Sequence, residues 1–276
     1  MDIIQRNIFK LIRCGAFNTK EQIEPMSAFK WAKLFQLAII HDVASDVYEG
    51  LQQCKDQFFL RMTEAQWELW EKTVNDIRQA PPSEDQEENE FLKADHLTNP
   101  ILNHKLQNIL DDESSDTRTR QLLLTIIRTA RHILNEGLPI KELILLGKEL
   151  RHESSRIDFN TLEKWLRSLK FQQAAHLEGA LLVELLGFEK EEIPFISTTD
   201  DAHVKQVAQE LIEFTHSRPR NYYFTQGDDN IFVHTNNGSA ILGHVRRSAR
   251  YFRYFPSETL TNFFATFAHS LSHIEE

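Results

Sequence analysis

The first eighty residues alternate between amphipathic stretches and short polar breaks. Apolar residues recur every three or four positions, the spacing of one helix face. Gly15 follows the first stretch as a stop signal, and Ser27 and Asp42 stand where they can cap a second and a third helix. The pattern predicts a four-helix block over residues 1–80, whose fourth helix starts with a Thr63–Gln66 capping box. The residues expected to face inward are, helix by helix, Ile4, Ile8, Leu11 and Ile12; Trp31, Leu34, Phe35 and Ala38; Val43, Val47 and Leu51; and Trp67, Trp70, Val74 and Ile77.

Residues 81–116 interrupt this pattern. Pro81 and Pro82 end the fourth helix, and the stretch that follows holds ten acidic residues and two lysines, a local net charge of −8. A segment of this composition can bury little of its surface. We expect an acidic linker, with one short helix around Ile101 to Leu110, whose charges form a solvated surface.

A second helical block is predicted over residues 117–276. Asp158 or Asn160 can cap one of its helices, and apolar stripes at helical spacing run through residues 123–134, 143–150, 162–169, 177–185 and 204–214. A strand pattern occurs late, where Tyr222–Thr225 and Ile231–His234 flank a polar loop. We therefore expect a mainly α protein, a bundle-like multi-helix body with one small β-hairpin near residues 222–234, in which the two helical blocks pack together.

Composition and charge narrow the functional classes. The chain has only nine glycines and eight prolines in 276 residues, and such a low content is typical of proteins built from long helices. A net charge of −10 makes the chain a poor ligand for nucleic acid, and no apolar run approaches the ~18 residues of a membrane span. Cys14 and Cys54 have neither metal-ligand spacing nor a disulfide framework. We expect a cytoplasmic protein without membrane insertion.

The sequence lacks the usual catalytic signatures. It contains no Asp-x-Asp pair, no phosphate-binding glycine loop and no Gly-x-Ser-x-Gly turn. The adjacent pairs Asp111-Asp112, Asp200-Asp201 and Asp228-Asp229 would point to opposite faces of a strand and could not clasp one ion. His269 and His273 are four apart, but Ser270-Leu271-Ser272 separates them without a carboxylate. We expect no catalytic residue, no metal site and no cofactor.

An arginine cluster near the C-terminus is the strongest candidate binding site. Arg246, Arg250 and Arg253 follow at i, i+4 and i+7 and would share one helix face, with Arg247 and Tyr254 beside them and Phe252 on the opposite, core-facing stripe. Guanidinium groups in this arrangement can bind phosphate or carboxylate bidentately. They can equally pair with the chain's own acids, and the net negative charge favours that pairing over a small anionic ligand.

Several stretches of the chain also carry a family resemblance. Phe29–Ala38, Val43–Leu51, His96–Pro100, Ala130–Leu138, Leu185–Phe188, Arg247–Arg250 and Tyr254–Leu260 resemble the helical parts of a bacterial, polymerase-β-type nucleotidyltransferase-like family associated with polysaccharide loci. Members of that family carry a catalytic domain with an Asp-x-Asp pair between the two helical blocks. Here the corresponding span, 79–95, is far too short for it. Lys141-Glu142 and Leu145-Leu146 also replace polar pairs of the family.

The resemblance implies a nucleotidyltransferase-like homologue that has lost its catalytic domain, so no catalytic residue is carried over. We expect a non-enzymatic binding or regulatory protein whose partner is another protein, such as an intact paralogue or a polysaccharide-assembly enzyme. The alternative is a nucleotide- or anion-binding protein, or an enzyme of unknown class, that uses the Arg246–Arg253 face. A protein partner requires an exposed apolar patch, whereas a small ligand requires a pocket.

Overall fold

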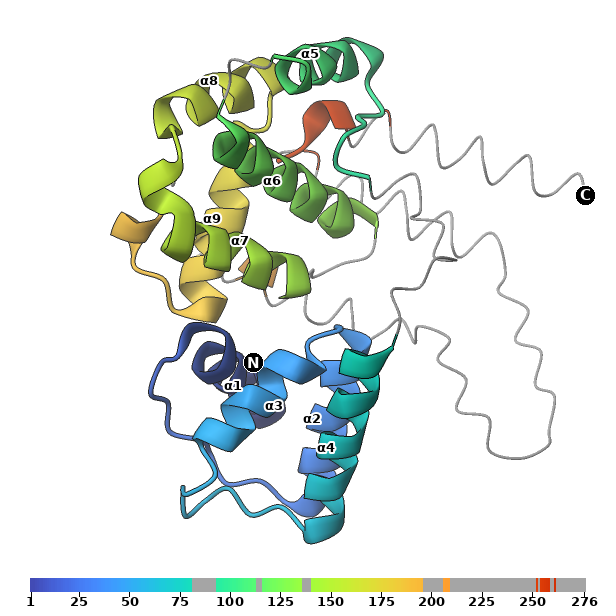
Figure 1. Cartoon of the computed structure of the whole chain (residues 1–276), viewed down its shortest axis with the longest axis vertical. Helices are drawn as coiled ribbons and strands as arrows, with labels where there is room; N and C mark the ends of the chain where they lie inside the picture. Colours follow the sequence, from blue (N-terminus) through green and yellow to red (C-terminus); the bar gives the residue numbers. More distant parts are fainter. Residues whose placement is uncertain are drawn as a thin grey trace, which may run out of the picture. The chain divides into compact units, whose positions relative to one another are not determined.

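The protein is mainly helical, as expected. The computed structural model describes residues 1–80, 93–112, 116–135, 140–195 and 206–208, with 252, 254–258 and 261 (Figure 1). The helices are α1 Ile3–Phe17, α2 Ala28–Ile40, α3 Ala44–Gln53, α4 Glu64–Gln79, α5 Pro100–Leu110, α6 Thr117–Asn135, α7 Ile140–Glu153, α8 Phe159–Leu169 and α9 Gln172–Leu186, with short 3₁₀ turns at Ser154–Arg156 and Lys190–Glu192. These ranges contain no β-strand, and the hairpin expected near 222–234 lies outside them.

The chain divides into two compact units, and each is built from three separate stretches. Unit 1 comprises Met1–Glu88, Pro139–Arg156 and Gly179–Gln209, and unit 2 comprises Asn89–Leu138, Ile157–Glu178 and Glu210–Glu276. The expected block 1–80 falls within unit 1, whereas the expected block 117–276 is shared between the two units. None of the described helices has both the length and the apolar character that a membrane crossing requires.

In unit 1, helices α1 and α3 pack backbone to backbone. A Cβ atom added at Gly15 would lie 1.9 Å from the carbonyl oxygen of Asp46, and one added at Gly50 would lie 2.0 Å from that of Leu11. Glycine is therefore required at both positions, because any side chain would push the two helices apart. Gly15 is not the helix stop that its place in the sequence suggested, since α1 continues to Phe17 and is capped by Asn18, whose φ is +54°.

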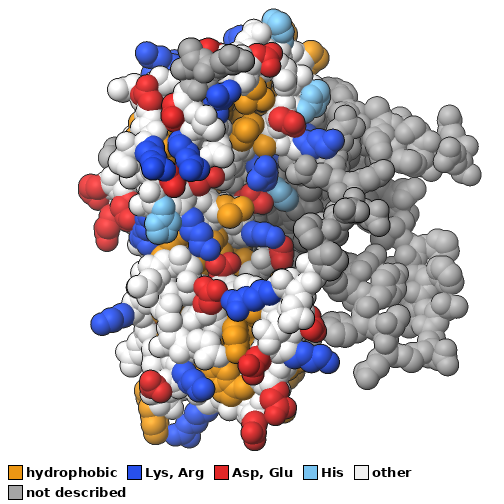
Figure 2. Space-filling model, viewed as in Figure 1, with side chains coloured by type: hydrophobic (Ala, Val, Ile, Leu, Met, Phe, Trp, Pro, Cys, Tyr) orange, Lys and Arg blue, Asp and Glu red, His pale blue; other side chains and the backbone are white. Residues whose placement is uncertain are grey.

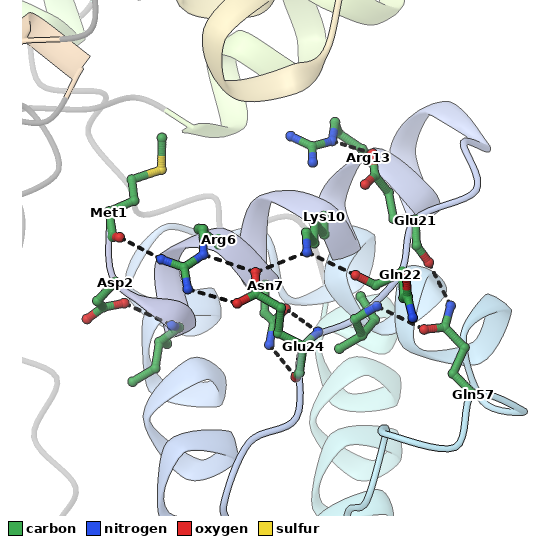
Figure 3. A network of polar contacts seen from close by, with 12 residues as sticks. Met1, Asp2, Arg6, Asn7, Lys10, Arg13, Glu21, Gln22, Glu24 and Gln57 are labelled. Carbon is green, nitrogen blue, oxygen red and sulfur yellow. Dashed lines mark hydrogen bonds and ion pairs between the residues drawn. The ribbon is translucent and has the colours of Figure 1, made fainter.

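The loop between α1 and α2 is held by polar side chains, most of them from α1 (Figure 3). The Glu24 carboxylate accepts hydrogen bonds from Arg6 Nε and Nη2 at 3.0 and 2.8 Å and from Lys10 Nζ at 3.0 Å. Asn7, which is buried, donates to the Glu24 carbonyl at 2.9 Å and accepts from its N–H at 2.9 Å. The hydrogen bonds from Arg6 and then Lys10 lower the pKa of Glu24 to about 2.

Two of the three predicted caps in unit 1 are confirmed. Ser27 accepts a hydrogen bond from Lys30 N–H at the start of α2, and Thr63 and Gln66 form the expected capping box of α4. The cap expected at Asp42 is wrong. Asp42 has a φ of +53° and its carboxylate is bound by Lys141 on α7, while Val43 takes the capping position without a side-chain bond.

The core of unit 1 contains two aromatic centres. The Trp70 ring lies between Phe35 on α2 and Tyr48 on α3, with ring centroids 4.8 and 6.5 Å away. At the second centre the rings of Phe17 and Phe188 meet edge to face at 5.2 Å, and the Arg151 guanidinium lies 5.0 and 4.0 Å from their centroids. Ile77, expected to face inward, is instead 42% exposed near the end of α4.

In unit 2, hydrogen-bonded side chains join the helix starts. The Thr119 hydroxyl on α6 donates to Asp116 at 3.0 Å and accepts from the Asp158 N–H at 2.9 Å. Asp158 in turn caps α8, as expected, by accepting from Asn160 and Thr161 N–H. The starts of α6 and α8 are thereby held together by one buried hydroxyl.

Candidate interaction surface

The predicted arginine cluster is represented in the described residues only by its last member. Arg246, Arg247, Arg250 and Arg253 lie outside them, so their pairing or ligand binding stays a prediction. Tyr254 is 8% exposed, with its ring centroid 6.4 Å from that of Phe255. Phe252, expected on the core-facing stripe, is 49% exposed, so that part of the prediction is wrong.

A buried carboxylate follows Tyr254 and holds this segment to the start of α5. Glu258 is 2% exposed, and its oxygens accept from Thr98 N–H at 3.1 Å, Thr98 Oγ1 at 2.9 Å and Asn99 N–H at 3.1 Å. Asn99 itself caps α5. Thr98 Oγ1 also lies 2.6 Å from Thr261 Oγ1, so Glu258 belongs to a hydrogen-bond network that joins this segment to the start of α5, and its role is structural.

The described residues hold no grouping that would bind a metal. Nowhere in them do three or more His, Cys, Asp or Glu side chains come together at ligand distance. Asp111 and Asp112 are exposed at the end of α5. Asp200-Asp201, Asp228-Asp229, His269 and His273 fall outside the described part of the chain.

A different feature stands out in unit 1, where phenylalanine side chains project into solvent. Phe29 on α2 is 68% exposed, and Phe58 and Phe59, in the loop between α3 and α4, are 71% and 42% exposed. We call these three residues and the half-buried Trp67 on α4 the aromatic end. Figure 2 shows hydrophobic side chains reaching the surface in the region of α2, α3 and α4.

The starts of two helices build the aromatic end. α2 and α4 begin at the same end of unit 1, where the loop from α3 also passes (Figure 1). The side-chain nitrogen of Gln66 donates to the Ala28 carbonyl oxygen at 2.9 Å and so ties the first turn of α4 to that of α2. Because Gln66 also belongs to the Thr63 capping box, one side chain fixes both helix starts.

The loop that carries Phe58 and Phe59 is fixed on both sides of these residues. The Gln57 side chain accepts from Ile23 N–H at 2.9 Å and donates to the Glu21 carbonyl at 2.7 Å. Leu60 is 8% exposed, and its N–H donates to the Gln57 carbonyl at 3.0 Å. The two rings are therefore presented outward from an ordered backbone, and they meet edge to face at 5.2 Å.

A cation lies over three of the four rings. Lys33 Nζ is 4.8 Å from the centroid of Phe29, the Arg61 guanidinium carbon is 4.5 Å from that of Phe58, and Lys55 Nζ is 5.8 Å from that of Trp67. At an exposed site each such contact contributes about 0.5–1 kcal/mol, enough to bias the orientation of the ring without burying it.

The charges around the aromatic end are of both signs. Lys30, Lys33, Lys55 and Arg61 are accompanied by three exposed acids from the loop before α4 and from α4 itself, Asp56, Glu64 and Glu68. This surface therefore lacks the single-sign field that attracts a polyanion.

Sequence reasoning did not identify the aromatic end. Phe29 falls outside the inward stripe of α2, and Phe58-Phe59 interrupts a polar break between helices. The available signals were a large apolar residue, Phe29, at a position that the helical period assigns to solvent, and two more, Phe58 and Phe59, inside a polar break. Comparison with known proteins adds no further guide, because the chain matches no protein family, no curated protein and no solved structure.

Proposed function

We propose that this chain is a non-enzymatic binding protein that holds a protein partner at the aromatic end. The observation that carries the proposal is the exposure of Phe29, Phe58 and Phe59 on a backbone that is fixed by hydrogen bonds. Aromatic and arginine side chains are enriched at the centres of protein interfaces. An ordered loop loses little conformational entropy on binding, so most of the contact energy remains available for affinity.

The chemistry of this surface favours a protein over a nucleic acid. Single-stranded nucleic acids also stack on aromatic rings, but their binding depends on a positively charged groove. The acids beside Lys33, Lys55 and Arg61, together with the net charge of −10, oppose a phosphate backbone. A protein surface of mixed polarity fits both the rings and the charges of both signs around them.

Replacement of the two loop phenylalanines tests this proposal. We expect Phe58→Ala/Phe59→Ala to weaken partner binding about 30-fold, because two hot-spot rings are removed. Ile101→Ala is the matched control, since Ile101 is a comparable exposed apolar residue, 72% exposed, in unit 2. Quantitative affinity purification from the native cells should recover the same partner with the wild type and the control. Equal recovery with the double variant would rule the aromatic end out.

The nucleotidyltransferase-like ancestry is part of the same proposal and has its own test. A homologue without its catalytic domain should gain no Mg²⁺-dependent stability from a nucleoside triphosphate. Thermal unfolding with ATP, with and without Mg²⁺, should therefore give equal midpoints. A metal-dependent rise would instead favour the nucleotide-binding alternative, and Arg246→Ala/Arg250→Ala would then be expected to abolish it.

A further inference from the structure

The only two cysteines of the chain meet in the core of unit 1. Cys14 lies in the last turn of α1 and Cys54 directly follows α3. Their Sγ atoms are 3.6 Å apart, and the residues are 1% and 2% exposed. The sequence separates them by 40 positions, so the contact is a product of the fold.

The glycine crossing of α1 and α3 brings the two thiols together. Gly15 directly follows Cys14, and the Cys54 N–H donates to the carbonyl of Gly50 at 3.0 Å. Cys14 is the neighbour of Gly15 and Cys54 follows Gly50 by one helical turn, so the close approach of the two helix backbones brings the cysteines within reach of each other.

The two sulfur atoms have different roles in their hydrogen bond. The Cys54 thiol donates to Cys14 Sγ, which lowers the pKa of Cys14 to about 7, with smaller contributions from the Glu21 backbone N–H and from Arg13. Donation to Cys14 and burial raise the pKa of Cys54. Near neutral pH, Cys14 is therefore the sulfur of the pair that ionises more readily, and Cys54 stays protonated.

We propose that Cys14 and Cys54 form a modification site that a peroxide oxidises to an intramolecular disulfide, with Cys14 as the attacking thiol and Cys54 as the resolving one. The Cys14 thiolate attacks the terminal oxygen of the peroxide, the O–O bond breaks, and Cys14 becomes a sulfenic acid. The remainder of the peroxide leaves as an alkoxide or hydroxide and takes up the proton that Cys14 released on ionising, which gives an alcohol or water. The Cys54 sulfur then attacks the Cys14 sulfur, and the sulfenic oxygen leaves as water with the Cys54 proton. Two thiols are oxidised and one peroxide is reduced.

Access to the thiols depends on the loop that contacts them. Glu21 donates its backbone N–H to Cys14 Sγ, and the Glu21 carbonyl is in turn held by the Gln57 side chain at 2.7 Å. Release of Gln57 would free the segment that carries Glu21. We expect Gln57→Ala to accelerate oxidation several-fold, because local opening is then less costly.

Peptide mapping of the wild type tests the site directly. After hydrogen peroxide treatment, the intact mass should fall by two hydrogen atoms, and trypsin should release residues 14–20 joined to residues 34–55. A thiol reductant should restore both free peptides. A gain of oxygen atoms without the cross-linked peptide, or a disulfide between two molecules, would overturn the proposal.

Single serine variants test the separate roles. Cys54→Ser keeps a hydroxyl donor for Cys14, so Cys14 should give a sulfenic acid that dimedone traps, whereas Cys54 should not be trapped in Cys14→Ser. Equal trapping in both variants would overturn the assignment of roles. The wild-type oxidation rate provides a measurement without substitution, and it should rise as the pH passes about 7. A rate independent of pH between 6 and 8 would contradict a Cys14 thiolate.

Discussion

The Glu24 carboxylate collects two cations from neighbouring turns of one helix. Arg6 and Lys10 lie four residues apart on α1, and both reach the same carboxylate, which is only partly exposed (Figure 3). A pair of this kind differs from an isolated surface ion pair, because one anchored carboxylate serves two cations and fixes the loop that leads to α2.

Acid should weaken this contact in a defined pH range. The pKa of Glu24 in the folded protein, about 2, is below its ordinary value of 4.5, so the stabilisation is present above pH 4.5 and is lost as the pH falls toward 2. Glu24→Gln should lower the free energy of unfolding at neutral pH by about 1 kcal/mol and flatten its decline between those values. Urea unfolding at several pH values measures both effects.

Glu49→Gln is the matched control, because the Glu49–Arg78 pair is half exposed on both sides. Its replacement should cost less than about 0.5 kcal/mol. If the two replacements lower the free energy of unfolding by the same amount, the second cation at Glu24 contributes nothing to stability.

At the scale of elements, the contact of α1 with α3 depends on the absence of two side chains. The obstacles at Gly15 and Gly50 are carbonyl oxygens of the facing helix, which cannot rotate away. At Gly147 on α7, by contrast, an added Cβ would meet ring atoms of Phe188 and Phe17 at 2.8 and 2.9 Å. A ring can shift where a helix backbone cannot.

Alanine at these glycines should therefore have different effects. Gly→Ala gains about 1 kcal/mol of helix propensity, whereas forced separation of packed elements costs about 1–3 kcal/mol or more. We expect Gly50→Ala to destabilise the protein by about 2 kcal/mol and Gly147→Ala to be near neutral, as measured by chemical denaturation. Equal effects would show that the α1–α3 backbone contact is not the determining constraint.

The helices themselves were largely predictable from the sequence, because burial of one face imposes a period of 3.6 residues. The stripes Trp31, Leu34, Ala38 and Leu162, Leu166, Leu169 are buried as expected, and the caps at Thr63 and Asp158 are confirmed. Gly15 was misinterpreted because a glycine at a helix end and a glycine at a helix crossing look alike in one sequence. Only the facing helix distinguishes them.

The candidate sites were not predictable in the same way. The exposure of Phe58 and Phe59 depends on Gln57 binding a loop thirty-six residues away, and the Cys14–Cys54 contact depends on the crossing of two helices. Neither contact leaves a periodic trace in the sequence. The spacing of Cys14 and Cys54 excluded a disulfide framework only as a motif, because spacing carries no information on proximity in the fold.

At the scale of the whole molecule, unit 1 is completed by residues distant in sequence from its first four helices. Arg151, on α7, lies against the rings of both Phe17 and Phe188 and forms an ion pair with Glu192 at 2.8 Å. The Arg13 guanidinium donates to the Leu185 carbonyl at 3.0 Å. The three stretches of chain that make up unit 1 thus meet around the guanidinium group of Arg151.

Removal of the Phe188 ring should destabilise unit 1 as a whole. Phe188 is 2% exposed, and a buried Phe→Ala replacement costs about 3–5 kcal/mol. We expect Phe188→Ala to lower the free energy of unfolding by about 3 kcal/mol. Phe58→Ala, at a 71% exposed position, should change it by less than about 0.5 kcal/mol. A small effect of Phe188→Ala would mean that the last stretch of unit 1 is only loosely attached.

The long reach of the bond from Arg13 to Leu185 has a consequence during synthesis. The two residues are 172 positions apart, so α1 leaves the ribosome long before its partner is translated. At ordinary elongation rates the delay is about 10–30 s. Throughout that interval Phe17 on the nascent N-terminal helices remains without its contact to Phe188, so this side of their core is exposed to water.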